Sequence, residues 1–344
     1  MTAVAVAEKQ NLVIPKTKNG RVRQRFTNPI PAEGEGGLFR ETWWPICLSS
    51  EVAQGQVIGK TFLDGRIVVY RGDDGVARVM SAYCPHMGAD LANGEVVGNE
   101  VECAFHKWRF NVDGYCSQTG IGDAPPPAAC VYAVPTHEKF DIIWAYNGDT
   151  PAFELPSFEH PDQIITKTIR MKEPFNADGW EFAANTPDYS HLVAVHNVEL
   201  VKREVVRREP FFWEWYYEVR HWKGEPTIYR VGVCGSNMFV KFTDHDGRYC
   251  ATIAGLSCPE PGKHEVFIVG AVLRGTDEQS KAEQEEWLSE YVTMEETFTM
   301  QDAEILNTQH YTQGSLTKSD DFLSEFLQHM RTYPRHHPSA DFIK

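Results

Sequence analysis

Two short cysteine–histidine motifs constrain the fold of this chain more than any other feature of its sequence. They read Cys84-Pro-His86 and Cys103-Ala-Phe-His106, and sixteen residues separate them. Two thiolates and two imidazoles at this spacing can bind either a single zinc ion or a [2Fe–2S] cluster. Zinc ribbons favour paired cysteines, whereas each motif here begins with a cysteine and ends with a histidine, as the tips of two β-hairpin loops would present them. The pattern therefore favours the cluster, with the cysteines on one iron and the histidines on the other.

The residues around these motifs resemble the two cluster-binding loops of the Rieske non-haem iron oxygenases. The resemblance rests on Cys-Pro-His-Met-Gly-Ala at 84–89 and Cys-Ala-Phe-His-Lys-Trp at 103–108, and it continues into the Val-Asp-Gly turn at 112–114. Respiratory Rieske proteins are similar but have an additional cysteine in each loop, where this chain has Ala89 and Ala104. The oxygenase branch is therefore favoured. The resemblance implies that the ligands of a [2Fe–2S] cluster are Cys84, His86, Cys103 and His106.

A second group of potential metal ligands lies downstream, between Asn185 and His196. Asp188 and His191 are three residues apart and share a face of a helix, whereas His191 and His196 are five apart and need a local bend to reach one metal. Pro187 must start or bend a helix within this stretch. Two histidines and one carboxylate form the facial triad of non-haem Fe(II) oxygenases, which leaves positions open for O₂ and substrate. A histidine pair alone is more often structural, but downstream of Rieske-like motifs it predicts a mononuclear iron site.

The resemblance also implies a third iron ligand and the residues that surround the iron. The family usually places the third ligand in its last long helix, where Asp302 occupies the matching position and Glu295 and Glu304 are the nearby alternatives. The iron ligands are accordingly expected to be His191, His196 and Asp302.

Asp188 and Asn185 receive other roles from the same resemblance. The family's counterpart of Asp188 accepts a hydrogen bond from a cluster-binding histidine of a neighbouring subunit, here His106, and touches His191. Carboxylates of this type orient imidazoles and tune the metal. Asn185 matches a position near the iron that fills or guards a coordination site. The resemblance also implies that the two metal sites of one chain lie too far apart for fast electron transfer, whereas a head-to-tail neighbour brings them close. Head-to-tail contacts that close produce rings, and the expected assembly is a homotrimer.

The distribution of strand and helix signals predicts an α+β protein. An N-terminal arm at 1–38 precedes residues 39–155, where short β-runs alternate with turns such as Asp64-Gly65, and this predicts an all-β Rieske domain. Residues 156–344 contain long β-runs and a closing helix, which predicts a second domain of layered α+β type, and the resemblance implies that this is the catalytic mononuclear iron domain. The resemblance implies a helix-grip fold there, an antiparallel sheet with a long C-terminal helix. The aromatic run 211–217 within this part is expected to pack in the core.

Composition and charge limit the partners and the location of the chain. It has 33 Lys and Arg against 48 Asp and Glu, a net charge of −15, which argues against nucleic acid and anionic membrane surfaces as partners. No run of apolar residues has transmembrane length, and the N-terminus lacks the apolar core of a signal peptide, so a cytoplasmic location is expected. Eight cysteines are too sparse for a disulfide scaffold of this size.

The expected function is that of the oxygenase component of a multicomponent Rieske oxygenase. Its cofactors are the [2Fe–2S] cluster and a mononuclear Fe(II), and its substrates are O₂ and an aromatic or other cyclic organic compound, which it hydroxylates or demethylates. A separate reductase or ferredoxin supplies electrons, because no Gly-x-Gly-x-x-Gly motif for a nicotinamide follows a strand. The chain looks most like the single-subunit type, such as dicamba and vanillate O-demethylases and ketosteroid hydroxylases. The alternatives are a Rieske electron carrier with a non-catalytic ligand-binding domain, and a desaturase or oxidative cyclase that uses the same irons.

Overall fold

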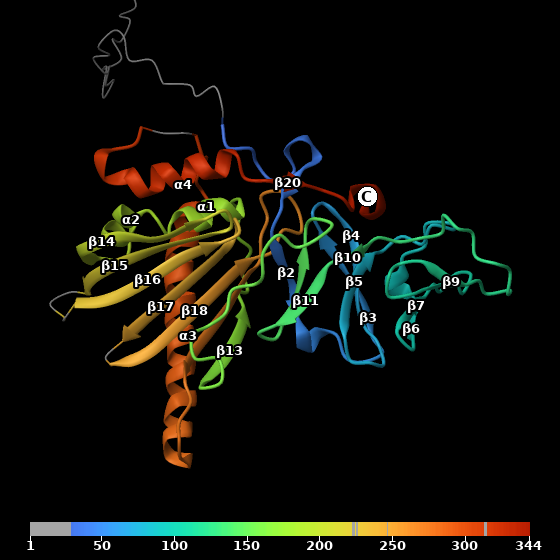
Figure 1. The fold of residues 1–344 in the computed structure, drawn as a ribbon, viewed down its shortest axis with the longest axis horizontal. Helices are drawn as coiled ribbons and strands as arrows, with labels where there is room; N and C mark the ends of the chain where they lie inside the picture. The colour runs from blue at the N-terminus through green and yellow to red at the C-terminus, as the bar shows by residue number, and fades with distance from the viewer. Residues whose placement is uncertain (1–28, 222–223, 225, 246, 313–314) are drawn as a thin grey trace, which may run out of the picture.

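The computed structural model describes residues 29–344 except 222–223, 225, 246 and 313–314. Most of the predicted N-terminal arm, residues 1–28, lies outside this part of the chain. The predicted α+β class is confirmed, because in the described residues five antiparallel sheets combine with a small number of helices. Figure 1 shows the small sheets on the right of the molecule and one large sheet with its helices on the left.

The small sheets form the N-terminal β-region. A three-stranded sheet and a four-stranded sheet share a core that includes Trp44, Val69 and Ile143. The strands of these two sheets are β2 (Trp43–Leu48), β11 (Thr136–Lys139), β12 (Ile142–Tyr146), β3 (Val57–Phe62), β4 (Gly65–Arg71), β5 (Ala77–Ser81) and β10 (Ala133–Val134). A further four-stranded sheet lies at the right-hand end of Figure 1 and is built from β6 (Glu95–Val97), β7 (Glu100–Glu102), β8 (Arg109–Phe110) and β9 (Cys116–Gln118).

The large sheet has seven antiparallel strands in the order β13-β19-β18-β17-β16-β15-β14. The strands are β13 (Ile164–Arg170), β14 (Val198–Glu209), β15 (Phe212–His221), β16 (Pro226–Cys234), β17 (Met238–His245), β18 (Arg248–Leu256) and β19 (Val266–Leu273). All but β13 follow one another as neighbouring hairpins, so the sheet is largely a meander. β13 pairs with β19 and thereby brings the segment that enters this region beside the last strand.

Helices pack against this sheet. The 29-residue helix α3 (Glu278–Leu306) buries Leu288, Tyr291 and Val292 with residues of β18 and β19. It approaches β19 so closely that a side chain at Gly270 would collide with Val292. The shorter helices are α1 (Gly179–Ala184), α2 (Tyr189–Ala194), α4 (Asp321–Arg331) and α5 (Ala340–Ile343). The sheet and α3 agree with the expected antiparallel sheet and long C-terminal helix.

The aromatic run 211–217 packs in the core, as predicted. Trp215 and Tyr217 of β15 are fully buried, and they belong to a cluster that contains Phe326 and Met330 of α4. Alternate residues of a strand point to one face, so this spacing directs both rings toward the same side of the sheet. The run therefore anchors α4 on the sheet.

The hairpin between β3 and β4 turns one residue earlier than the Asp64-Gly65 pattern predicts. Leu63 and Asp64 both have positive φ, 48° and 60°, as the two central residues of a type I′ turn do. Leu63 is fully buried, and its amide donates to the carbonyl of Cys258. Gly65 opens β4, where a side chain would collide with Ile343. Contacts with segments far along the chain therefore determine the position of this turn.

A buried ion pair joins the start of the described chain to the large sheet region. Glu33 and Arg40 form an ion pair in which both side chains are fully inaccessible to solvent. The Glu33 amide donates to Asp178 at 3.0 Å, and Asp178 caps α1. Arg40 also donates to the carbonyl of Pro31 at 2.8 Å. The pair therefore holds the entering segment against the first helix of the C-terminal region.

Removing Glu33 is expected to destabilise the protein strongly. Glu33→Ala leaves the Arg40 guanidinium buried without its carboxylate, and breaking a buried pair in this way costs about 3–5 kcal/mol in the free energy of unfolding. The matched control is Glu35→Ala, because Glu35 is exposed and such substitutions usually change stability by less than about 0.5 kcal/mol. Denaturant unfolding of both variants measures the difference. Equal stability losses in the two variants would contradict the role of the pair.

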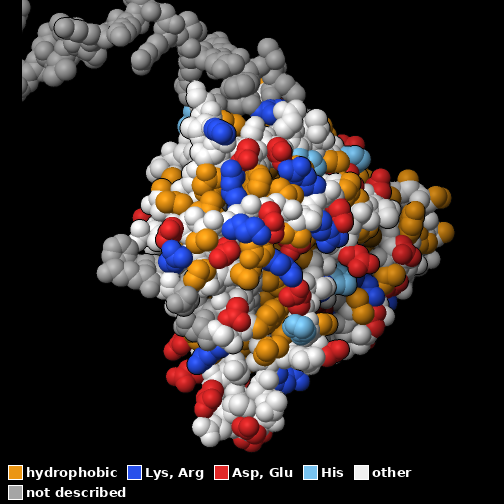
Figure 2. All heavy atoms as spheres, turned by 60° about the vertical axis from the view of Figure 1, so that its left-hand side comes forward, with side chains coloured by type: hydrophobic (Ala, Val, Ile, Leu, Met, Phe, Trp, Pro, Cys, Tyr) orange, Lys and Arg blue, Asp and Glu red, His pale blue; other side chains and the backbone are white. Residues whose placement is uncertain are grey.

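Charges on the surface of the large sheet are mixed rather than segregated. Figure 2 shows acidic, basic and hydrophobic side chains interspersed over the face that carries the left-hand side of Figure 1. On β14 the cations have acidic neighbours, as in the pair between Arg207 and Glu209 at 2.7 Å. Exposed pairs of this kind contribute little to stability. Within the described part of the chain, no helix combines the length and apolar character needed to cross a bilayer.

Candidate functional site

The two cysteine–histidine motifs form loops with the same backbone hydrogen bonds. The Cys84 amide donates to the carbonyl of Ala89 at 2.9 Å, and the Gly88 amide donates back to Cys84 at 2.8 Å. In the second loop the Cys103 amide donates to Trp108 at 2.8 Å, and the Lys107 amide donates back to Cys103 at 3.1 Å. The fifth residue of each loop has positive φ, 74° at Gly88 and 55° at Lys107.

The left-handed backbone at Lys107 is supported by its side chain. Lys107 forms ion pairs with Glu95 at 2.8 Å and with Glu102 at 3.0 Å. Glu95 and Glu102 are directly opposite each other on β6 and β7. A lysine can therefore occupy a position where glycine stands in the first loop, because its side chain secures the second loop to the sheet below it.

These loops carry the four predicted cluster ligands. Cys84 and Cys103 are buried, whereas His86 is exposed and His106 half-buried. The two imidazole rings lie with their centroids 4.4 Å apart, and His86 stacks on Trp108 at 4.4 Å with nearly parallel planes. The cysteines thus lie on the inner side and the histidines on the outer side, where another protein could reach them.

The donor set fits a [2Fe–2S] cluster. Both cysteines are free thiols, and neither forms a disulfide. Burial raises the pKa of the Cys84 thiol to about 11, so a metal is needed to hold it as the thiolate that ligates iron. Two thiols and two imidazoles are the donors of a Rieske centre.

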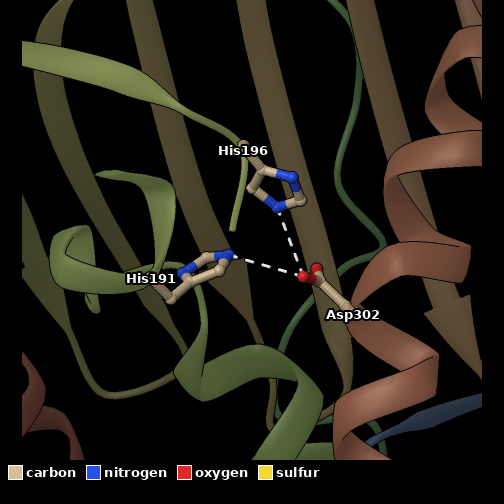
Figure 3. Close-up of side chains that lie close together, drawn as sticks. All are labelled: His191, His196 and Asp302. Atoms are coloured by element: carbon tan, nitrogen blue, oxygen red, sulfur yellow. Dashed lines mark ion pairs between the residues drawn. The ribbon is translucent and has the colours of Figure 1, made fainter. Parts of the chain in front are cut away.

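The second group of predicted ligands also converges, and the break between two helices makes this possible. Pro187 lies between α1 and α2, and Asp188 is the N-cap residue of α2. α2 ends at Ala194, and Asn197 has a positive φ of 53° just before β14 begins. His196 therefore leaves the helix and turns back toward His191, which supplies the bend that the five-residue spacing requires. Asp302 approaches both from α3 (Figure 3).

Three ligand atoms meet in this site. The Nε2 atoms of His191 and His196 lie 3.6 Å and 3.2 Å from Oδ1 of Asp302. One ligand atom from each residue lies within 4.8 Å of the others, so a single metal ion could contact all three. All three side chains are largely shielded from solvent, with exposed fractions of 10–14%. Two imidazoles and one carboxylate are the donors of a 2-His-1-carboxylate iron site.

Hydrogen bonds at the other ring nitrogens orient the two histidines. Nδ1 of His191 lies 2.7 Å from the carbonyl oxygen of Asp188, and Nδ1 of His196 lies 3.1 Å from Oε1 of Gln301. These oxygens only accept, so Nδ1 carries the proton and Nε2 has a free lone pair in the neutral ring. Nε2 of His191 is buried and has no hydrogen-bond partner. That orphaned atom, aimed at Asp302, has the free lone pair that a metal ligand needs.

Electrostatics around His196 reflect its carboxylate neighbour. Burial alone lowers the pKa of an imidazole, but the hydrogen bond and negative charge of Asp302, together with the hydrogen bond to Gln301, raise the pKa of His196. In the absence of a metal the site therefore attracts a proton to the position that a cation would take.

The other predicted residues occupy distinct places around this group. Asn185 lines both the cavity beside the three ligands and a second cavity of about 150 Å³ that Asp188 also lines. Oδ1 of Asp188 accepts from the His191 amide at 3.3 Å, and burial raises the pKa of this carboxyl. Glu304 is exposed, and Glu295 forms an ion pair with Lys241, so neither alternative carboxylate faces the histidines as Asp302 does.

The cavity next to the three ligands has a volume of about 110 Å³, well beyond the space of one water molecule. Strands β16 to β19 and helix α3 supply most of its wall. Three residues of this site were not predicted from the sequence. Two of them, Lys241 and Thr252, line the cavity, and the third, Gln301, contacts His196. Gln301 precedes Asp302 directly, but only the fold shows that its side chain reaches His196.

Comparisons with known proteins identify a domain in the N-terminal part of the chain. Residues 42–131 match the Rieske [2Fe-2S] domain family. Cholesterol 7-desaturase nvd of Bombyx mori is 34% identical over 165 residues, which are 46% of this chain and 36% of that protein. The oxygenase component of 3-ketosteroid-9-alpha-monooxygenase from Rhodococcus rhodochrous is 29% identical over 165 residues, which are 46% of this chain and 43% of that protein. The chain thus spans less than half the length of these curated relatives.

The fold is shared over a larger part of the chain. The structure of NdmA from Pseudomonas putida CBB5 with caffeine superposes with a TM-score of 0.69 at 15% identity, covering 85% of this chain and 94% of that one. The chain is thus a protein with a Rieske [2Fe–2S] domain. Its relatives include the oxygenase component of 3-ketosteroid-9-alpha-monooxygenase, and its fold is shared with NdmA. The domain identifies a [2Fe–2S] cluster as a cofactor.

Proposed function

We propose that this chain is the oxygenase component of a multicomponent Rieske oxygenase that hydroxylates or oxidatively demethylates an aromatic or other cyclic organic compound. The observation that carries the proposal is the convergence of His191, His196 and Asp302 beside a cavity. Two histidines and one carboxylate leave coordination positions open for O₂ and substrate. When bound, the cluster supplies single electrons taken from a separate reductase or ferredoxin, and the mononuclear iron activates O₂.

The residues of the chain have separate tasks in this proposal. Cys84, His86, Cys103 and His106 hold the cluster. His191, His196 and Asp302 hold the iron, while the Asp188 carbonyl and Gln301 keep the imidazoles in the tautomer that ligates metal. The apolar wall of the cavity binds the substrate and excludes water. We assign cluster binding to a Rieske domain at residues 39–155 and iron binding to a catalytic domain at residues 156–344. A cytoplasmic location stays a prediction.

The test is a single-turnover experiment on the purified protein. The protein is chemically reduced without a partner, freed of reductant, and mixed with air and a panel of methoxybenzoates, other aromatic acids, steroids and N-methyl compounds. We expect one compound to accelerate re-oxidation of the cluster and to gain oxygen or lose a methyl group by mass spectrometry. Iron and sulfide analysis accompanies it, with roughly three irons per two sulfides expected.

Two other readings predict different results in this experiment. A Rieske electron carrier would contain about two irons per two sulfides and would re-oxidise at one rate whatever compound is added. A desaturase would accelerate re-oxidation but remove two hydrogens instead of adding oxygen. The desaturase alternative has support in the relative named cholesterol 7-desaturase. The mass of the product distinguishes desaturation from hydroxylation.

We further propose that the active assembly is a head-to-tail homotrimer. In Figure 1 the sheet β6–β9, which borders the cluster loops, and the helix α2, which carries His191, lie toward opposite ends of the long axis. A neighbouring subunit can bring its cluster site close to the iron site of the first chain. Head-to-tail contacts repeated around a ring produce this arrangement at every interface. The exposed side chains of Met87 and Phe105 at the cluster loops are available for such a contact.

Complementation between two inactive variants tests the assembly. Cys103→Ser removes a cluster ligand, and Asp302→Ala removes an iron ligand. Co-expression is expected to restore activity, because some interfaces then join an intact cluster loop to an intact iron site, roughly a quarter of them under random assortment in a ring. Product formation by the purified mixed oligomer is the measurement. Activity that stays at the level of the separate variants would indicate that each chain works alone.

A further inference from the structure

A buried ion pair lies in the wall of the cavity beside the iron-ligand group. Lys241 of β17 and Glu295 of α3 are in contact, with only 10% and 6% of their side chains exposed. Oε2 of Glu295 also accepts from the hydroxyl of Thr252 at 3.1 Å, and that hydroxyl is 2.7 Å from the hydroxyl of Tyr291. Lys241, Thr252 and Glu295 all line the cavity. Removing two charged side chains from water costs free energy. A buried pair in the wall of a ligand cavity therefore suggests a role in ligand binding.

The pair lies at a defined position relative to the iron ligands. Glu295 and Asp302 are seven residues apart on α3, so they share one helix face and are separated by about 10 Å along its axis. Phe298 and Thr299 line the cavity between them. The cavity thus has an iron-ligand end and a polar end, and a bound compound would present different parts of itself to each.

The wall between the two ends is apolar. It includes Leu192, Val231, Phe239, Ala254, Ile268 and Phe298. Such a wall favours a compound whose body is hydrocarbon, because each buried apolar area contributes to binding. Away from the iron ligands, the charged side chains of the wall are Lys241 and Glu295, and Thr252 is hydrogen-bonded to Glu295.

The charge balance at the polar end determines which group it can accept. Lys241 is already matched by Glu295, so a carboxylate on the ligand would compete with Glu295 for the ammonium while being repelled by it. An ammonium has three donors, and the bond to Glu295 uses one of them. The ring centroids of Tyr229 and Tyr291 also lie near the ammonium, 5.4 Å and 5.7 Å from Nζ. A neutral oxygen can therefore accept a hydrogen bond from Lys241 without disturbing the pair.

We propose that the Lys241–Glu295 pair, with Thr252, selects a neutral cyclic substrate that carries a ketone or hydroxyl oxygen, and orients it so that the opposite end of the molecule faces the iron ligands. This inference rests on the proposed oxygenase function. It excludes aromatic acids from the preferred substrates. The pair acts as a specificity element at a distance from the reacting centre.

The affinities of three compounds of similar shape test whether the Lys241–Glu295 pair prefers a neutral oxygen. They are 2-acetylnaphthalene, 2-naphthoate and 2-isopropylnaphthalene, which place a ketone, a carboxylate and a hydrocarbon group on the same ring system. Calorimetric titration of the holoprotein is expected to show the ketone binding about tenfold more tightly than the hydrocarbon. The acid is expected to bind at least about tenfold more weakly than the ketone. Equal affinities, a preference for the acid, or no binding of any probe would overturn the proposal.

Two variants separate selection from folding. Glu295→Gln preserves shape but leaves Lys241 uncompensated, so the order is expected to reverse, with 2-naphthoate gaining about tenfold or more. The double variant Lys241→Met with Glu295→Leu removes both charges together, and it should abolish the advantage of the ketone over the hydrocarbon. Glu304→Gln, an exposed carboxylate on the same helix, is the control and should leave the order unchanged. An unchanged order in Glu295→Gln would also overturn the proposal.

Iron analysis of the same samples distinguishes this inference from the proposed function. If the ketone is preferred by a protein that retains only about two irons per two sulfides, the selection stands and the oxygenase function fails. If the mononuclear iron is present and an aromatic acid is turned over and bound best, the oxygenase function stands and this inference fails.

Discussion

Asp302→Ala is expected to yield a protein that keeps its [2Fe–2S] cluster but has lost the mononuclear iron and nearly all product formation. The ratio should fall from roughly three to about two irons per two sulfides. Oδ1 of Asp302 is the atom toward which both Nε2 atoms point, at 3.2 Å and 3.6 Å. Without it two imidazoles remain, so we expect turnover to fall by about a thousandfold or more, as the loss of a group essential to the reaction does.

The control for this prediction is available two residues away. Glu304 is exposed on the same helix, so Glu304→Gln should keep both the iron and the activity. Metal analysis, the visible spectrum of the cluster and product formation are measured on both variants. If Asp302→Ala keeps its third iron, the carboxylate ligand must come from another residue and the assignment of the site fails.

Much of this site could be predicted because its signals are local in the sequence. The cluster loops are short segments whose cysteines, histidines and turn residues are close together, and their shared hydrogen bonds follow from that local sequence. The need for a bend between His191 and His196 followed from the helical repeat, and the structure supplies it by ending α2 at Ala194. The choice of Asp302 over Glu295 and Glu304 came from the resemblance to a family rather than from spacing.

The parts that could not be predicted depend on contacts between distant segments. Lys241 and Glu295 are 54 residues apart, and nothing in either local sequence indicates that β17 and α3 bring them together. The turn at Leu63 and Asp64 departs from the Asp-Gly pattern because its backbone bonds to residues near position 258. Local patterns therefore predicted many of the elements and the need for a bend between His191 and His196, whereas packing between distant segments determined the wall of the cavity.

Asp188→Asn is expected to slow product formation while both metals are retained. Asparagine can still cap α2, and the carbonyl that holds His191 is part of the backbone, so the iron site should assemble. The substitution removes only the charge with which Asp188 is proposed to bind His106 of a neighbouring subunit. The loss of a carboxylate that orients a ligating histidine typically reduces activity by about 10–100-fold. The expected signature is therefore a slow first turnover with full iron content.

A second helix-capping aspartate provides the comparison. Asp277 caps α3 by accepting from the Ser280 amide at 2.9 Å, and it is exposed. Asp277→Asn makes the same chemical change without touching either metal site, so it should leave turnover within about twofold of the unchanged protein. The decisive measurement is the rate of cluster re-oxidation after mixing the reduced protein with O₂ and substrate. If Asp188→Asn matches Asp277→Asn in that rate, the aspartate serves only as a helix cap, and the contact between subunits must use another residue.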